Sequence, residues 1–527
     1  MKCPSQTLSV VALALGIAAC GSRAPAPDDV TGSAPEPPSS SEPPAEREPQ
    51  RDPALPPLGV PAVPAPPAPE HVRWIVAGGG ATPIDNQVSI EDDLALAAET
   101  LAGDGVLLFA GGAGTHGVQV LDAEPRGDRL TSLLGDLFDP RGGRNTHYRP
   151  TRLEPNGPAT AARFADALAG ALARPSDGPL TVYLAGHGVP AARRADVQLA
   201  MWGGRGLLPA DLAALLDKNP AAGRQVRFIL TSCFSGAFAD ALFVAGDPDK
   251  SAAAPLRCGF FAAPWDRPSS GCDPDPDGRR SGYGVQLLRA LAGVDPAGEP
   301  TELALLDLDH DGHVSLLEAH TRARVIAPGF DVPTTTSERW LRVVAAEQGW
   351  PVPLAGDDPA PSAPLDLPEE DAVIAALSRR LAVADEAAVA AHVAEQRAGL
   401  AELDAEVLRA SEAEAVAGDR IAAATLARWP VLDDPWHPDY AATLATERAA
   451  IEDWFQVHAD YHGYLAAREA TDRAADRRDT VVLTLSPWLT LQRAFETRRL
   501  AGHLQHLGGE ALATFEALRA CERGRAR

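Results

Sequence analysis

A cysteine and a histidine each stand just after a short apolar segment of the chain. Cys233 follows the segment 226–230 (VRFIL), and His187 follows the segment 180–185 (LTVYLA). A thiol beside an imidazole is a combination that serves nucleophilic catalysis, because the imidazole moves protons while the thiolate attacks a carbonyl carbon. The two residues therefore predict acyl-transfer chemistry, with Cys233 as nucleophile and His187 as general acid and base.

The two apolar segments have to bring these side chains together, because positions 187 and 233 are 46 residues apart. Each segment is short and bounded by turn residues, which is typical of a buried parallel strand. The intervening length is enough for a crossover connection between parallel strands. Since α/β folds place their sites at the carboxyl ends of the strands, we predict that His187 and Cys233 lie side by side at one sheet edge.

Backbone groups complete the predicted site. The N–H groups of Gly188 and Cys233 are the expected donors to an oxyanion. A helix that begins just after 234–236 would direct its N-terminal N–H groups at the sulfur and favour the thiolate. His116, which follows the apolar segment 105–110 and a glycine-rich stretch, is the alternative histidine, although no cysteine lies near it in the sequence.

The two segments and their endings resemble the caspase–legumain–gingipain group of cysteine peptidases. The resemblance rests on AGHG at 185–188 and TSCFSG at 231–236, and it covers about 72–350. It implies a mostly parallel sheet with helices on both faces, a His187–Cys233 dyad and no cofactor for catalysis. The pentapeptide around the caspase cysteine is absent, so the chain is more similar to the legumain-like and bacterial branches.

The resemblance also implies where a peptide substrate would be recognised. In the group, the segment after the strand expected at 258–263 lines the pocket for the residue before the cut bond, and relatives cut after Asp, Asn, Arg or Lys. Asp266 follows that strand here and Asp85 follows the first strand, so either carboxylate could meet a basic side chain. The alternative is that both are ordinary solvated loop carboxylates.

Two other functions stay open at this point. One is a binding scaffold in which the peptidase fold has lost its activity. The other is an acyl-transferring relative, a transpeptidase, which passes the same thioester to an amine instead of water. The sequence does not show which nucleophile enters.

A twelve-residue acidic loop predicts a calcium site. Asp307, Asp309, Asp311, His313, Ser315 and Glu318 stand at positions 1, 3, 5, 7, 9 and 12 of an EF-hand pattern, with Gly312 at the turn position. Carboxylate oxygens at alternate positions wrap a hard cation, and a glutamate at the twelfth position can close the shell. The segment before the loop is short, so a lone calcium loop is expected. The alternative is an acidic, solvated start of a helix.

The N-terminal segment has the features of an export signal. Lys2 is followed by an apolar stretch that ends IAACGS at 17–22, which resembles a bacterial lipoprotein signal with the lipid on Cys20. We therefore expect a signal peptide at 1–19, a Pro-rich tether at 20–70 and attachment to a membrane of the bacterial cell envelope. An ordinary secretory signal is the alternative.

Cysteines beyond the candidate nucleophile suggest a crosslink. In an oxidising compartment Cys258 and Cys272 could close a loop of about 15 residues, which is worth roughly 3 kcal/mol. The alternative is two independent thiols, and Cys521 is left over.

Composition and patterning divide the chain further. The formal net charge of −25 argues against a nucleic-acid partner. We predict a peptidase domain at 71–350, with a long loop at 119–155, then a linker at 351–369 and a helical domain at 370–527. Apolar residues in that domain recur at helical spacings, which predicts an antiparallel bundle whose third helix has Pro487 in its first turn. This domain is a candidate partner-binding module, membrane-facing stalk or regulatory cover.

Overall fold

The structure is a computed structural model that describes residues 71–114, 116–121, 129–138, 146–173, 178–218, 223–271, 282–351, 365–434 and 437–525. The predicted signal peptide, the tether and Cys20 lie outside the described residues, and so does Cys272.

Six strands form the central sheet, in the order β10-β9-β8-β5-β1-β2. Neighbouring strands are parallel except for the pair of β10 and β9. The strands are β1 (Trp74–Gly79), β2 (Gly105–Phe109), β5 (Leu180–Gly186), β8 (Val226–Leu230), β9 (Arg257–Phe261) and β10 (Thr334–Thr335). The sequence analysis therefore predicted a mainly parallel sheet correctly, because strands buried on both faces read as continuous apolar runs.

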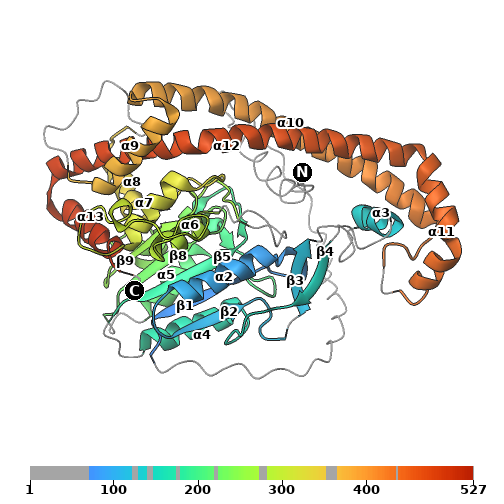
Figure 1. Ribbon diagram of the computed structural model, residues 1–527, viewed down its shortest axis with the longest axis horizontal. Coiled ribbons are helices and arrows are strands. Elements are labelled where there is room, and N and C mark those ends of the chain that lie inside the picture. Colours follow the sequence, from blue (N-terminus) through green and yellow to red (C-terminus); the bar gives the residue numbers. More distant parts are fainter. Residues whose placement is uncertain are drawn as a thin grey trace, which may run out of the picture.

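Helices cover both faces of this sheet (Figure 1). Alternate strand residues point to opposite faces. Val182 and Phe228 pack with the first group of helices, and Tyr183 and Ile229 pack with the second. The first group is α4 (Ala161–Ala173), α5 (Pro209–Asp217) and the 3-10 helix η4 (Ser235–Leu242); the second is α2 (Val88–Thr100), α6 (Tyr283–Leu291) and α7 (Leu316–Ile326).

The predicted loop at 119–155 contains regular structure. Strands β3 (His116–Leu121) and β4 (Thr146–Pro150) form an antiparallel ribbon, and α3 (Arg129–Phe138) lies between them in the sequence. The prediction was wrong because the many Gly, Pro, Asp and Arg residues of this segment suggested a loop and hid the signals of three short elements. Leu130 and Leu134 of α3 are buried in a cluster with Ile421, Ile451 and Phe455, which lie far along the chain.

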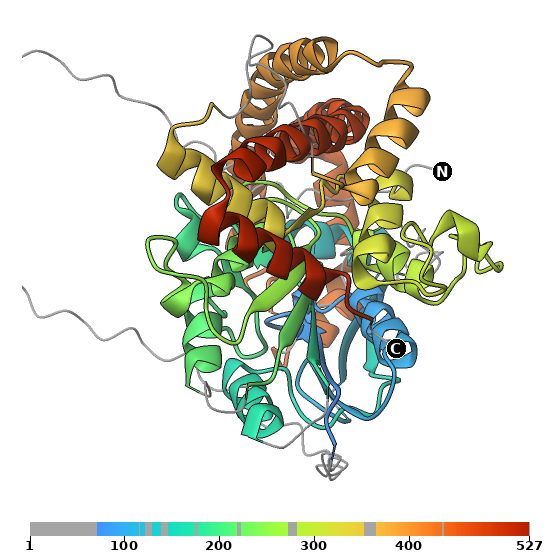
Figure 2. The ribbon, with the colours of Figure 1, turned by 90° about the vertical axis from the view of Figure 1, so that its left-hand side faces the viewer.

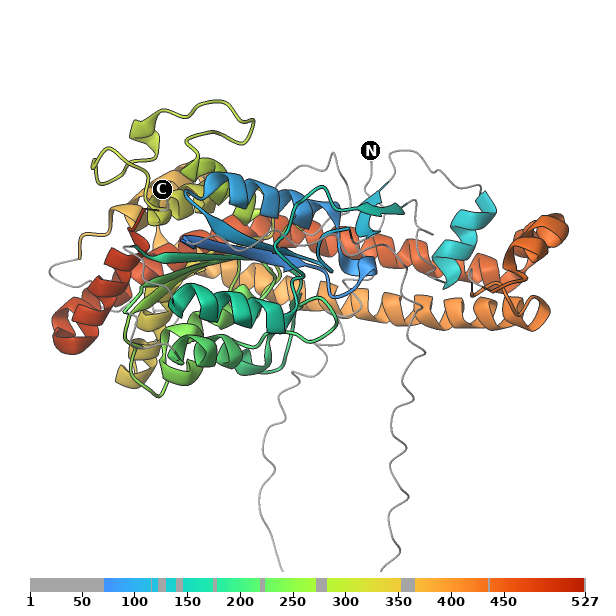
Figure 3. The ribbon, with the colours of Figure 1, turned by 90° about the horizontal axis from the view of Figure 1, so that it is seen from below.

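The C-terminal region is a long helical hairpin rather than a compact bundle. Helix α10 (Glu386–Arg428) lies beside α12 (Ala459–Leu507), with α11 (Tyr440–Val457) at the far end (Figures 1 and 3). We call α10, α11 and α12 the arm. Pro487 lies inside α12 and does not begin a helix. Its neighbours Leu485 and Leu489 are buried in a cluster with Val332 of the sheet-containing part, so packing compensates for the lost backbone hydrogen bond.

The arm contacts the sheet-containing part at both ends. At the base, Leu341 and Val344 of α8 (Thr336–Gln348) pack against Leu500 of α12 and Phe515 of α13 (Gly509–Glu522). At the tip, the two leucines of α3 pack against a cluster that includes Ile421, Ile451 and Phe455. The helical region is therefore bound to the rest of the molecule and not held on a free linker.

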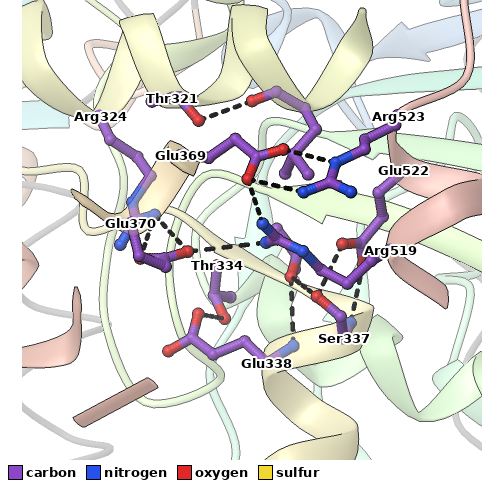
Figure 4. A network of polar contacts seen from close by, with 12 residues as sticks. Thr321, Arg324, Thr334, Ser337, Glu338, Glu369, Glu370, Arg519, Glu522 and Arg523 are labelled. Carbon is purple, nitrogen blue, oxygen red and sulfur yellow. Dashed lines mark hydrogen bonds and ion pairs between the residues drawn. The ribbon is translucent and has the colours of Figure 1, made fainter. Parts of the chain in front are cut away.

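A network of buried polar contacts and ion pairs also links the helices near the base of the arm (Figure 4). Glu369 of α9 (Pro368–Leu381) accepts from Arg519 and, at 2.7 Å, from Arg523. Glu370 accepts from Arg324 of α7 at 2.8 Å, and Glu522 of α13 accepts from Ser337 of α8. Buried charges are stable only with such partners, so this network fixes how α7, α8, α9 and α13 meet.

The predicted disulfide is wrong in its partner. Cys258 of β9 is bonded to Cys521 of α13, with their Cα atoms 6.1 Å apart, so the cysteine that seemed left over is the one that pairs. Both cysteines are buried in an apolar cluster with Leu242, Phe243 and Leu518, where α13 lies against the sheet (Figure 2). Proximity in the sequence favoured Cys272, but the fold brings together two residues separated by 263 positions.

Candidate active site

His187 and Cys233 follow adjacent parallel strands of the sheet. Strand β5 ends one residue before His187, strand β8 ends three residues before Cys233, and Leu184 is in register with Leu230. The backbone of Gly188 lies against that of Cys233, since a Cβ at position 188 would be 1.8 Å from the Cys233 carbonyl oxygen. Both side chains are partly exposed. The predicted juxtaposition of the two chain segments is therefore present.

The histidine ring is held through one nitrogen. Nε2 of His187 lies 2.8 Å from the backbone oxygen of Asp85 and 2.7 Å from Oε1 of Gln87. Both partners only accept hydrogen bonds, so Nε2 carries a proton and Nδ1 is left to take up or release one. The sequence analysis missed Gln87, because a lone glutamine 100 residues from the histidine carries no signal.

A buried asparagine positions these two acceptors. Oδ1 of Asn86 accepts from the Gly80 N–H at 3.0 Å, and its Nδ2 donates to the Gly117 oxygen at 2.9 Å. A Cβ at Gly80 would lie 2.4 Å from the backbone of Asp85, so the chain approaches as closely as only glycine permits. Gly80, which follows β1, is therefore explained by the packing of this turn, which carries the acceptors of the His187 ring.

The cysteine sulfur is surrounded by polar groups of one serine. The backbone N–H of Ser269 lies 3.2 Å from the Cys233 sulfur, and its hydroxyl lies 3.7 Å away and donates to the Thr231 oxygen at 2.9 Å. The backbone oxygen of Ser269, 3.4 Å from the sulfur, can accept a hydrogen bond from the thiol, so the backbone of this one residue can donate to the sulfur and accept from it. Ser269 was missed because it reaches the site from the segment after β9, and a serine in a Pro- and Ser-containing loop is unremarkable in sequence.

The backbone after the cysteine turns sharply. Phe234 has a φ of 60° and a ψ of 11°, which is left-handed and costly for a bulky residue. Hydrogen bonds hold this turn: the Phe234 N–H donates to the Arg267 oxygen and the Gly236 N–H to the Ala263 oxygen, each at 2.8 Å. The helix expected after 234–236 begins at Ser235 and is of the 3-10 type.

The ribbon after the histidine leaves an amide available. Strands β6 (Gly188–Val189) and β7 (Gln198–Leu199) are antiparallel, and the Ala200 N–H donates to the His187 oxygen at 2.8 Å. Gly188 and Leu199 are therefore a non-hydrogen-bonded pair, whose N–H groups point away from the partner strand. This orientation suits the predicted role of the Gly188 N–H as a donor to an oxyanion.

The two carboxylates predicted for the substrate pocket lie in different surroundings. The Asp85 carboxylate accepts from the backbone N–H groups of Ala81 and Thr82, at 3.0 and 2.7 Å, so it stabilises its own turn. Asp266 is exposed and lines a cavity together with several arginines, among them Arg194 and Arg267. The two residues are not brought together, and Asp85 contacts His187 only through its backbone oxygen.

The acidic loop assembles part of the predicted calcium site. Single carboxylate oxygens of Asp307, Asp309 and Asp311 lie within 4.8 Å of one another. The Glu318 carboxylate is outside this group and accepts from the backbone N–H groups of Leu308 and Ser315, at 2.6 and 2.8 Å.

The other residues of the acidic loop have local roles. The Ser315 hydroxyl caps helix α7, and the His313 N–H donates to Asp311. Arg525, near the C-terminus, pairs with Asp311 at 3.1 Å. Oxygen donors alone suit Ca²⁺, so the three aspartates fit the ion and the glutamate is committed elsewhere.

The alternative histidine is placed differently from His187. His116 begins β3 of the separate two-stranded ribbon, instead of ending a strand of the central sheet.

None of the described helices has the length and apolar character needed to cross a membrane.

Comparison with known proteins gives no further lead. No model of a known protein family matches the chain, and no curated protein matches its sequence.

Proposed function

We propose that this chain is a cysteine endopeptidase with a caspase-like or legumain-like fold and a His187–Cys233 dyad. The observation that carries the proposal is the contact between the backbones of Gly188 and Cys233 at the carboxyl ends of two adjacent parallel strands. Two further features support it. The His187 ring is held through one nitrogen and leaves the other for proton transfer, and Phe234, next to Cys233, keeps a costly left-handed conformation of the kind found at functional sites.

The proposed reaction proceeds in two steps. The Cys233 thiolate attacks the peptide carbonyl, and the N–H groups of Gly188 and Cys233 donate to the oxyanion that forms. The carbon–nitrogen bond then breaks, and protonated His187 gives its proton to the leaving amine. In the second step His187 takes a proton from water, the resulting hydroxide attacks the thioester, and the acid and the thiolate separate.

The cavity around Asp266 does not support a basic preference. The arginines that line it with this carboxylate would repel a Lys or Arg side chain of a substrate, and Asp85 is engaged in its own turn. We therefore propose no preference for the charge of the residue before the cut bond.

We also propose a calcium site and a lipid anchor. Asp307, Asp309 and Asp311 would hold a Ca²⁺ ion with a structural role, supported by their convergence. The N-terminal signal and Cys20 would anchor the protein to the bacterial cell envelope through lipid.

The test compares the wild-type chain with Cys233→Ala, using Cys272→Ser as the matched control. A peptide library and a thiol-directed probe with a peptide leader are applied to each. We expect cleavage and labelling by wild type and the control, and loss of both in Cys233→Ala. Equal cleavage by wild type and Cys233→Ala would refute the proposal, and a wild type that neither cleaves nor labels would favour the inactive scaffold.

A further inference from the structure

A cavity of about 460 Å³ lies between the arm and the sheet-containing part. One wall comes from the segment after β9, from Gly236 and from α8, and the other from α10 and α12. Its most unusual feature is that six of the lining residues are arginines: Arg194, Arg267, Arg339, Arg342, Arg397 and Arg493. Such a concentration is unexpected in a chain with a net charge of −25.

Four carboxylates neutralise only part of this charge. Arg339 pairs with Asp240 at 2.6 Å, and Arg342 pairs with Glu496 at 3.2 Å. Glu338 forms ion pairs with both Arg342 and Arg493, at 2.8 and 2.6 Å. Asp266 is the fourth carboxylate. Six guanidinium groups against four carboxylates leave an excess of two positive charges.

Several guanidinium nitrogens have no acceptor among the described residues. They are Nε and Nη2 of Arg267, Nε and Nη1 of Arg342, and Nε of Arg493, and all are buried. A buried donor without an acceptor is costly, and a guanidinium group is suited to bidentate binding of an oxyanion. The cavity therefore has both the charge and the donors for an anion.

The titration of the surrounding groups agrees with a positive cavity. Burial, together with the charge of Arg339, lowers the pKa of Arg194 to about 10. Burial alone would raise the pKa of Glu338, but the charges of Arg493, Arg342 and Arg324 outweigh it and lower this pKa to about 2.

We propose that this cavity binds a small oxyanion with at least two negative charges, of the phosphate or carboxylate class, which bridges the arm and the sheet-containing part. The volume is that of a small-molecule site. An anion there would supply the acceptors that the buried nitrogens lack, and arginines from both walls would contact it.

The cavity is coupled to the turn that follows Cys233. Arg194 donates to the Gly236 oxygen at 2.9 Å, and the Arg267 oxygen accepts from the Phe234 N–H at 2.8 Å. Anion binding is nevertheless expected whether or not the chain is a peptidase, so Cys233→Ala is expected to bind as wild type does.

The test is isothermal titration calorimetry of the purified chain with sodium pyrophosphate and with sodium citrate, at ionic strength held constant with sodium chloride. Pyrophosphate represents the phosphate class and citrate the carboxylate class. We expect one saturable site for at least one of them. Arg267→Gln should weaken binding at least about tenfold, because it removes a charge-assisted contact.

Arg193→Gln is the matched control, since Arg193 is exposed and pairs with Asp196 on the surface. This variant should bind within about twofold of wild type, an effect below that of one hydrogen bond. Arg397→Gln, an exposed residue on α10, provides a second variant if Arg267→Gln does not fold. Absence of saturable binding, or equal binding by wild type and both arginine variants, would overturn the proposal. So would binding of a glutamate-rich peptide with neither small anion bound.

Discussion

Gly188 and Cys233 are in direct backbone contact, and no side chain fits between them, because a Cβ at position 188 would be 1.8 Å from the Cys233 carbonyl oxygen. The contact joins the ends of β5 and β8 and sets the separation of the two segments that carry the proposed dyad.

Gly188→Ala is expected to push these segments apart. We expect peptidase activity to fall at least about a hundredfold, since small displacements at a reacting centre have effects of this size. The free energy of unfolding should fall by about 1–3 kcal/mol, as overpacking does elsewhere. Gly170→Ala is the control, because a Cβ there meets nothing within 4 Å in helix α4. That variant should be neutral or slightly more stable, and an equally neutral Gly188→Ala would contradict the contact.

Cys258 and Cys521 should be recovered as one disulfide-linked pair of peptides after proteolysis without reduction. A crosslink over 263 positions restricts the unfolded chain strongly, so Cys521→Ser should lower the free energy of unfolding by as much as about 5 kcal/mol. Denaturant unfolding with and without a reductant measures this. Recovery of Cys258 joined to Cys272 would contradict the structure.

Asp331 should make stability depend on pH. Burial raises its pKa to about 7, although the N–H groups of Ser270 and Tyr283 donate to its carboxylate. The folded chain therefore keeps a proton that the unfolded chain has lost between about pH 4 and pH 7. Because the unfolded state binds fewer protons at this group in this window, the contribution of Asp331 to the free energy of unfolding falls as pH rises through it, by up to about 4 kcal/mol.

The measurement is urea unfolding at several pH values for wild type, Asp331→Asn and the exposed control Asp472→Asn. The free energy of unfolding of wild type minus that of Asp331→Asn should decrease from pH 4 to pH 7 by up to about 4 kcal/mol, whereas the same difference for Asp472→Asn, an exposed position, should not change with pH. Parallel pH profiles for wild type and Asp331→Asn would show that the carboxylate does not titrate in this range.

Calcium should stabilise the chain if the three aspartates bind it. The melting temperature should rise with CaCl₂ and much less with MgCl₂, because Mg²⁺ requires a tighter octahedral shell. Asp307→Asn should abolish the effect, since its carboxylate belongs to the converging group.

Arg525→Ala provides a test in the opposite direction. Removal of the guanidinium group that pairs with Asp311 should tighten calcium binding a few-fold, as loss of one exposed ion pair suggests. A melting temperature that does not respond to calcium in either wild type or Arg525→Ala would exclude the site.

The sequence by itself determined the strands and the ends at which the candidate residues stand. The segments at 180–185 and 226–230 are apolar throughout because parallel strands are buried on both faces, so their type could be inferred locally. His187 and Cys233 could be predicted as neighbours because parallel strands with one crossover between them end at the same edge.

Only the tertiary structure decided which distant residues support them. Gln87 and Ser269 reach His187 and Cys233 through contacts across 100 and 36 positions, and Cys258 meets Cys521 across 263. The arginines of the cavity come from both the sheet-containing part and the arm. Periodicity and turn residues report local geometry, whereas these contacts depend on how separate elements pack, which the order of residues in any one segment does not encode.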